Sequence, residues 1–288
     1  MHSRELIQNR KSVRAFADKP VFFGELDKIR EYYNHSVRRL IPQIKTELRF
    51  FGADIQKELE GAAGYNHFLV GAPQYMVLLS KADELAHLNA GYIMEDLILK
   101  LTELNLDSCW LTFTDSDEIK KALGIHTSMQ VVSMVAFGYG KKTLKRMRLN
   151  IRSMSNVDLA AKHRYMDPKK GVHDIAFLDT WGNTRNLDTY IGFYDDLLWE
   201  ALYAASLSPS YLNRQAYGFL LHNGLVSLIS TPDTYNTPID SQLSLGIALL
   251  HFTAVAQELS ANISWRFGRD AGQVDLPEGH QLVATCTL

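Results

Sequence analysis

The chain has 288 residues, of which 46% are hydrophobic and 22% charged, the balance of a globular protein with a sizeable core. Its net charge of -2 argues against general nucleic-acid binding, and no uninterrupted apolar run approaches the roughly 20 residues of a membrane helix. The N-terminal sequence lacks the apolar segment of a signal peptide, and two cysteines are too few for a disulfide framework, so we expect a cytoplasmic protein that binds neither nucleic acid nor membrane.

The first distinctive segment is a basic arm, NRKSVRAF, at residues 9–16. It places Arg10, Lys11, Ser12 and Arg14 within five residues. Arginine offers a planar fork of donors, lysine a point charge and serine a hydroxyl, a combination that suits a phosphate group. The alternative is that these residues are ordinary surface charges at the end of a helix.

Two segments about 155 residues apart then share one pattern, an amphipathic helix followed by short strands. Gly91 precedes Trp110 by 19 residues, and Gly246 precedes Trp265 by the same number. Fourteen residues after each of these tryptophans comes another glycine. Strand-like runs flank both helices, at residues 72–80, 129–140, 224–230 and 280–288. We therefore predict a duplicated unit whose halves pack as an intrachain pseudo-dimer; the alternative is two helices that share a core pattern by coincidence.

The two copies differ in what surrounds them. The basic arm precedes the first copy, and a basic run without acidic residues follows it at 141–152. In an extended segment Arg146 and Arg148 of this run would point the same way; a solvated tail is the alternative. Residues 35–60 show no pattern that assigns them a role.

The polar, irregular stretch at residues 155–185 reads as a connection between halves. We therefore place the first half at residues 1–154, the connector at 155–185 and the second half at 186–288.

A polar elbow, SLSPSYLNRQAYGF, occupies residues 206–219 of the second half. It lies between an apolar helical run and a strand-like run, so its turn residues have an ordinary explanation. A bare turn, however, does not need Pro209, Ser210, Asn213 and Gln215 at these spacings. We therefore interpret the elbow as part of a binding site.

Arm, helices and elbow together resemble the nitroreductase family, the FMN-dependent enzymes of the α+β nitroreductase fold. The family arm has the form Arg-x-Ser-x-Arg/Lys, here RKSVR, and its elbow the form Pro-Ser-x-x-Asn-x-Gln, here PSYLNRQ. A short strand after a helix, here LDSCWLTF, and a Gly-Tyr strand followed by basic residues, here FGYGKKTLKRMR, complete the resemblance. Because arm and elbow lie in different halves, the chain looks like the fused, two-half TM nitroreductase type.

The resemblance implies an α+β nitroreductase-like fold with one non-covalent FMN per chain, bound between the halves, and a monomer or weak homodimer. The residues that match the family motifs fall into groups. The phosphate and ribityl end would be bound by Arg10, Lys11 and Ser12, with Arg146 and Arg148 completing the phosphate site. Near flavin N1 and the C2 carbonyl would lie Arg14, and N5 and O4 would meet the backbone N–H groups of Thr112 and Phe113. The flavin ring would be covered from the other half by Pro209, Ser210, Tyr211 and Asn213. Tyr211 replaces a small serine of the family, so it either stacks on the ring or narrows the pocket.

The implied activity is that of an oxidoreductase with a ping-pong mechanism. NAD(P)H, a transient electron donor, would deliver hydride to flavin N5, and a small-molecule acceptor such as a nitroaromatic, a quinone or another conjugated compound would then be reduced. The flavin carries the chemistry, so no catalytic side chain is expected. Two alternatives stay open: an FMN-binding protein without reductase turnover, and a scaffold that keeps the fold without flavin.

Other chemistry has no support in the sequence. It contains no H-E-x-x-H or C-x-x-C metal motif, no G-x-S-x-G and no G-x-G-x-x-G after a strand, so we expect no metal site, hydrolase elbow or Rossmann domain. Cys109, Trp110, Trp265 and His251 are interpreted as core residues.

Overall fold

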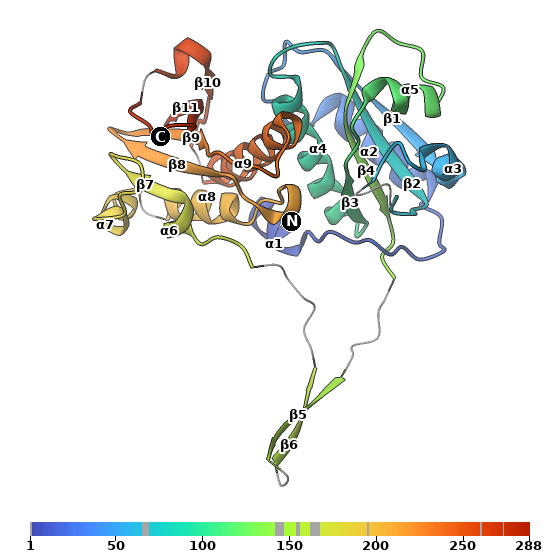
Figure 1. Cartoon of the computed structure of the whole chain (residues 1–288), viewed down its shortest axis with the longest axis horizontal. Coiled ribbons are helices and arrows are strands. Elements are labelled where there is room, and N and C mark those ends of the chain that lie inside the picture. The colour runs from blue at the N-terminus through green and yellow to red at the C-terminus, as the bar shows by residue number, and fades with distance from the viewer. Residues whose placement is uncertain are drawn as a thin grey trace.

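The computed structural model describes residues 2–64, 69–141, 147–153, 156–161, 168–194, 196–259, 261–272 and 274–288, with only the backbone for 147–153, 156–161 and 269–270. Two lobes, each with its own β-sheet, lie side by side (Figure 1). Helices α4 (Ala86–Glu103) and α9 (Pro238–Glu258) pack against each other where the lobes meet.

The first lobe contains an antiparallel sheet of order β1-β2-β4-β3. Besides α4, its elements are α2 (Phe23–His35), β1 (Thr46–Gly52), the 3-10 turn η1 (Ala53–Ile55), α3 (Gln56–Leu59), β2 (Gln74–Ser80), β3 (Asp107–Leu111), α5 (Ser116–Ala122) and β4 (Gln130–Gly138). Alternate residues of β2 enter different cores: Met76 and Leu78 pack with residues of α2 and α4, whereas Tyr75 and Val77 pack with residues of α3 and α5. Residues 35–60, left without a role by the sequence, include the edge strand β1.

The second lobe contains a sheet of order β10-β11-β9-β8-β7, in which only the β7–β8 pairing is parallel. Besides α9, its elements are α6 (Val172–Ile175), β7 (Ala176–Leu178), α7 (Leu187–Gly192), α8 (Leu197–Ser206), the 3-10 turn η2 (Tyr211–Asn213), β8 (Tyr217–His222), β9 (Leu225–Ser230), β10 (Arg266–Phe267), η3 (Gly268–Ala271) and β11 (Gln281–Thr287). The predicted order of strand, helix, strand and strand is therefore present in both lobes.

Two segments lie differently from the predicted division of the chain. Strand β7 falls within the connector assigned to 155–185, yet it belongs to the second sheet, so that lobe extends upstream of residue 186. Helix α1 (Ser3–Asn9) is N-terminal to the first lobe, yet Leu6 and Ile7 are buried in the core of the second, with residues of α8 and α9. Strands β5 (Met147–Ser153) and β6 (Asn156–Ala161) form a separate sheet with each other.

Helix α9 has the length and hydropathy of a membrane span, but its position in the fold gives a different explanation. Of its most apolar window, 72% is buried inside the protein. Its apolar residues pack against α4 and α8 and beneath the second sheet. The helix therefore has the composition of a core helix that is covered on most sides.

The contact between α4 and α9 is close and reciprocal. A Cβ atom on Gly91 would lie 2.2 Å from the carbonyl oxygen of Leu243, and one on Gly246 would lie 2.0 Å from that of Leu88. Gly91 and Gly246 are 155 residues apart, and so are Leu88 and Leu243. Each helix thus places its glycine over the backbone of the other, which only a residue without Cβ allows.

A second contact recurs at the same offset. The Asn89 Oδ1 atom on α4 accepts a hydrogen bond from the N–H of Ile41 over 3.0 Å. The Ser244 Oγ atom on α9, again 155 residues later, accepts one from the N–H of Tyr211 over 3.3 Å. Helix α4 therefore binds the irregular segment that follows α2, and helix α9 binds the irregular segment that follows α8.

Replacing Gly91 by alanine should force the two central helices apart. We expect Gly91→Ala and Gly246→Ala each to lower the free energy of unfolding by about 1–3 kcal/mol, the usual cost of overpacking. Gly24→Ala is the matched control, because a Cβ there meets nothing within 4 Å. Urea denaturation measures all three, and wild-type stability in Gly91→Ala would contradict this account of the helix contact.

Candidate functional site

The basic arm is held by backbone hydrogen bonds along the edge of the first sheet. Ser12 forms a parallel bridge with Ser108 of β3, and the N–H of Val13 donates to the Ser108 carbonyl over 2.8 Å. Farther along, the N–H of Ala17 donates to the Tyr139 carbonyl over 2.7 Å. Figure 1 shows the chain running from α1 across to this edge. The arm is thus fixed by its main chain, which leaves its side chains available for other contacts.

Three of the four predicted arm residues are exposed: Lys11, Ser12 and Arg14. Among the ion pairs between described residues, none involves Lys11 or Arg14. The Arg14 guanidinium lies near the thiol of Cys109, which is buried as expected. Burial raises the pKa of Cys109, and Arg14 opposes that shift only partly. The arm therefore presents two cations and a hydroxyl to solvent.

Thr112 and Phe113 lie just beyond the strand that the arm follows. Because the bridge between Ser12 and Ser108 is parallel, the arm and β3 run in the same direction from it, toward Thr112. The Thr112 carbonyl accepts the N–H of Gly64 over 2.7 Å, and Phe113 forms a bridge with Ala63. The structure thus brings the arm and residues 112–113 to one edge of the first sheet.

Arg10 points the other way, toward a buried carboxylate that the sequence analysis missed. Its Nε atom lies 3.4 Å from Glu95 Oε1, and the two side chains are 9% and 0% exposed. Trp110 donates through Nε1 to Glu95 Oε2 over 2.9 Å, and His251 Nε2 lies 3.2 Å from Oε1. Glu95 therefore joins the arm, the first sheet and helix α9.

His251 continues this network to the helix that leads into the elbow. Its Nδ1 atom lies 3.1 Å from the carbonyl oxygen of Ala204 in α8. The two ring nitrogens of His251 therefore lie within hydrogen-bonding distance of one oxygen from each lobe, Glu95 Oε1 and the Ala204 carbonyl. Arg10 is thus connected through Glu95 and His251 to Ala204, which lies five residues before Pro209 of the elbow. His251 is a buried residue with polar partners, as expected, but its partners come from both lobes.

The electrostatics of Glu95 depend on its partners. Complete burial by itself raises the pKa of a carboxyl group, but Arg10, His251 and Trp110 together outweigh burial, and the pKa of Glu95 lies below its ordinary value of 4.5. The group is therefore ionised at neutral pH in the interior. The signal in the sequence was a pair of adjacent acids, Glu95 and Asp96, inside the otherwise apolar run at residues 90–99, because buried carboxylates require partners.

The elbow is a tightly bonded turn. Gln215 is buried; its N–H donates to Ser210 Oγ over 2.9 Å, and its side-chain amide donates to the Ser206 carbonyl over 2.6 Å. Pro209 is buried, and Tyr211 is half-buried, with its N–H on Ser244 as described above.

Residues 168–170 brace the elbow from outside. The side chain of Asn213 donates to the Pro168 carbonyl over 2.9 Å and accepts from Lys169 Nζ. Lys170 Nζ donates to the Gln215 carbonyl over 2.8 Å. Both ends of the Asn213 amide therefore have partners within the chain.

The remaining predicted phosphate ligands are not brought to this edge by described contacts. Arg146 lies outside the described residues. Arg148 lies on β5, for which the structure describes the backbone, and β5 pairs with β6.

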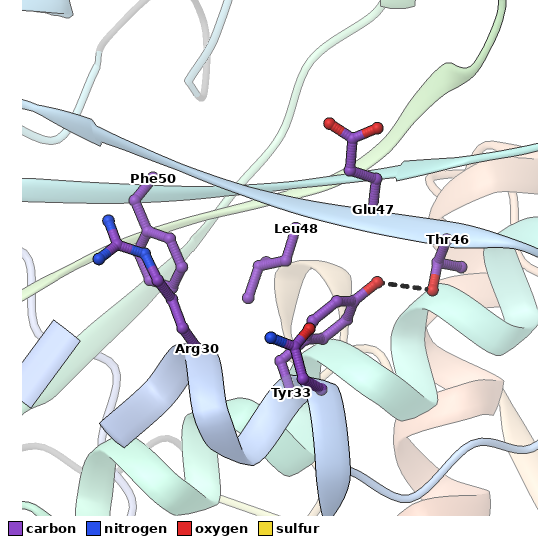
Figure 2. A pocket seen from close by; sticks show the side chains of 7 residues that line it. Arg30, Tyr33, Thr46, Glu47, Leu48 and Phe50 are labelled. Atoms are coloured by element: carbon purple, nitrogen blue, oxygen red, sulfur yellow. Dashed lines mark hydrogen bonds between the residues drawn. The ribbon is translucent and has the colours of Figure 1, made fainter. Parts of the chain in front are cut away.

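Two of the cavities between described residues have no lining residue from the arm or the elbow. One, of about 290 Å³, lies between α2 and β1, where Figure 2 shows Arg30 beside Phe50 and Tyr33 hydrogen-bonded to Thr46. The other, of about 700 Å³, is lined by residues around His280. Within the described part of the chain, no three His, Cys, Asp or Glu side chains are grouped to hold a metal ion.

The fold and the basic arm define the class of protein, an α+β protein of the nitroreductase-like fold. Over its whole length the chain superposes on a protein from Thermotoga maritima described as a "putative nitroreductase", with a TM-score of 0.60 and 17% identity over 94% of that chain. A nitroreductase family protein from Clostridium novyi has a TM-score of 0.44 and 19% identity, covering 49% of this chain and 87% of its own. An FMN-dependent nitroreductase from Clostridium difficile has a TM-score of 0.39 and 19% identity, covering 50% and 90%.

A family model described as "Putative TM nitroreductase" matches residues 3–172, more than half of the chain. The chain therefore belongs to this nitroreductase family, as its motifs indicated. The matched region contains the arm and the first lobe, whereas the elbow lies beyond it. A search of curated proteins returned no match.

Glu95→Gln should destabilise the protein in a pH-dependent way. The variant leaves the Arg10 cation buried without its carboxylate, which we expect to cost about 3–5 kcal/mol at pH 7. Because the folded-state pKa of Glu95 is depressed, its contribution is fully present above about 4.5 and is lost as pH falls through the folded value.

The difference in unfolding free energy between wild type and Glu95→Gln should therefore shrink below pH 4.5. Glu47→Gln, which removes an exposed partner of Arg49, is the control and should change stability by less than about 1 kcal/mol. A difference that stays constant from pH 7 to pH 3 would contradict an ionised Glu95.

Proposed function

We propose that the protein is an FMN-dependent oxidoreductase of nitroreductase type, which takes electrons from NAD(P)H and passes them to a conjugated small molecule such as a nitroaromatic or a quinone. The observation that carries this proposal is that three side chains of the basic arm are exposed together. Lys11, Ser12 and Arg14 are exposed together on a segment fixed to β3 by backbone hydrogen bonds. Family membership supports the same function.

The arm residues suit the groups that FMN would present to them. A phosphate forms its strongest contacts with several charged donors and a hydroxyl at once, and Lys11, Ser12 and Arg14 provide these without a competing acidic partner among the described ion pairs. Arg14 lies near the end of β3, where the family motif expects the flavin ring. FMN, when bound, supplies hydride transfer; the chain binds it, orients it and tunes it with positive charge.

We also propose that the two lobes are the halves of a pseudo-dimer, with the FMN site between them. Two kinds of contact support this: the glycines that meet across α4 and α9, and the side chains of Asn89 and Ser244 that each hold an irregular segment. Both recur at an offset of 155 residues. The network through Glu95 and His251 brings the arm and the helix before the elbow to one interface, as a site divided between halves requires.

An FMN-binding protein without turnover is the second candidate, and the elbow favours it. Tyr211 is half-buried and anchored on α9, and the Asn213 amide is bonded to residues 168 and 169. An elbow closed in this way could cover the flavin without leaving space for an acceptor.

An absorption spectrum of the purified protein titrated with FMN, before and after anaerobic NADH or NADPH, tests the function. We expect flavin absorption near ~450 nm that the nicotinamide bleaches, at one FMN per chain. Bound flavin that neither nicotinamide bleaches would favour the second candidate. Two FMN per chain would contradict the divided site, and no binding would contradict a flavin function.

Single arm variants should weaken FMN binding selectively. Lys11→Ala and Arg14→Ala each remove a charge-assisted contact, so we expect the Kd for FMN to rise about 10- to 100-fold. Lys28→Ala is the matched control, because Lys28 is an exposed lysine on α2, outside the arm. Isothermal titration measures the three constants, and equal affinities for Lys28→Ala and Lys11→Ala would count against a phosphate site on the arm.

A further inference from the structure

Upstream of residue 20, helix α1 contacts α8 and α9 of the second lobe as well as α4 of the first, and the arm that follows it continues along the first sheet, with Arg10 at the junction. On one side of Arg10, α1 is anchored to the second lobe: the N–H of Ser3 donates to Glu258 over 2.7 Å, and Arg4 forms an ion pair with Glu200. On the other side, the backbone of residues 12–17 follows β3 and β4 of the first lobe. A displacement of one lobe relative to the other would therefore act on the arm at Arg10.

Glu95 is placed to resist that displacement. It accepts from Trp110 of the first lobe and faces His251 of the second, while Arg10 of the arm lies 3.4 Å from the same carboxylate. The Arg10 Nη1 atom also lies 3.4 Å from Ser12 Oγ, so the contact reaches the exposed part of the arm. A single buried carboxylate thus connects all three structural units.

We propose that Glu95 is a positioning residue: by fixing Arg10 between the lobes, it holds Lys11, Ser12 and Arg14 in the arrangement that receives FMN. This inference rests on the proposed function for its ligand, but not for its geometry. Glu95 is fully buried, so it acts on the ligand only through the arm. Of the four arm residues, Arg10 points inward to Glu95, whereas Lys11, Ser12 and Arg14 are exposed.

The neighbouring residue provides a matched control. Asp96 is equally buried, and it accepts from Arg38 Nη1 over 2.6 Å, from the Arg38 N–H over 2.8 Å and from the Tyr32 hydroxyl over 2.9 Å. Like Glu95 it binds an arginine and other donors, but its arginine belongs to the segment after α2. Asp96→Asn should therefore disturb a similar buried pair without moving the arm.

The two cysteines report on the arm without any flavin. Cys109 lies in β3, the strand that the arm follows, with Arg14 nearby, whereas Cys286 is buried in the core of the second lobe. If Glu95→Gln releases the arm, Cys109 should react with a thiol reagent at least about tenfold faster than in wild type, relative to Cys286, because access limits a buried thiol. Asp96→Asn should leave this ratio near the wild-type value, since any general loss of stability exposes both cysteines.

The experiment measures this labelling ratio by mass spectrometry, together with the Kd for FMN, in wild type, Glu95→Gln and Asp96→Asn. We expect Glu95→Gln alone to raise both quantities about tenfold or more. Arg10→Met removes the other member of the pair and should give the same result, so it replaces Glu95→Gln if that variant fails to fold.

Equal labelling ratios in Glu95→Gln and Asp96→Asn would overturn the proposal, because they would make Glu95 an ordinary stability determinant. A raised ratio of Cys109 to Cys286 labelling with unchanged FMN affinity would overturn the claim that Glu95 supports FMN binding through the arm. If wild type binds no FMN, the proposed function fails, and the labelling ratio still decides whether Glu95 fixes the arm.

Discussion

The structure depends on how closely two helices can approach. At Gly91 and Gly246 the backbones of α4 and α9 meet with no space for a side chain. That contact sets the relative position of the lobes and brings the carboxylate of Glu95 opposite the ring of His251 on the other helix. Because the carboxylate is completely buried, its charge requires partners, and these are Trp110 of β3, His251 of α9 and the Arg10 cation of the arm.

Buried ion pairs of this kind contribute more to geometry than to net stability. Desolvation of two charges offsets much of their attraction, so an apolar replacement of the whole pair is often as stable. Apolar contacts are non-directional, whereas a buried carboxylate fixes the position of the arginine that it binds. Helix α4 carries two such groups in succession, Glu95 for the arm and Asp96 for the segment after α2. The helix therefore fixes two irregular segments that have little secondary structure to hold them.

The sequence predicted local features better than long-range ones. Periodicity and glycine–tryptophan spacing predicted the central helices and the strands around them, since these patterns report on a residue's immediate neighbours. The packing of α1 on the opposite lobe and the membership of β7 in the second sheet depend on contacts between distant segments, and no local pattern encodes them.

In the candidate site, too, the features formed by consecutive residues were predicted, and those that depend on distant residues were not. The arm was recognisable because its residues are consecutive, and in the structure Lys11, Ser12 and Arg14 are exposed together. Glu95 was missed because its partners are 85, 15 and 156 residues away along the chain. An acid in an apolar helix indicates a buried network but does not identify its members. The bracing of Asn213 by residues 168 and 169 was hidden for the same reason.

The same contacts explain why a pseudo-symmetric pair of lobes would carry one site. Asn89 on α4 and Ser244 on α9 hold equivalent segments, but the segments differ in chemistry. The segment after α8 ends in the elbow. The segment after α2 contributes Arg38, whose guanidinium is bound to the buried Asp96, so its charge is neutralised and directed into the protein. Among the described residues, the Arg38 cation at that position is therefore already paired and is not available to an anionic cofactor. The asymmetry of the proposed site thus follows from the different chemistry of the two segments, since one ends in the elbow and the other contributes a cation that Asp96 neutralises.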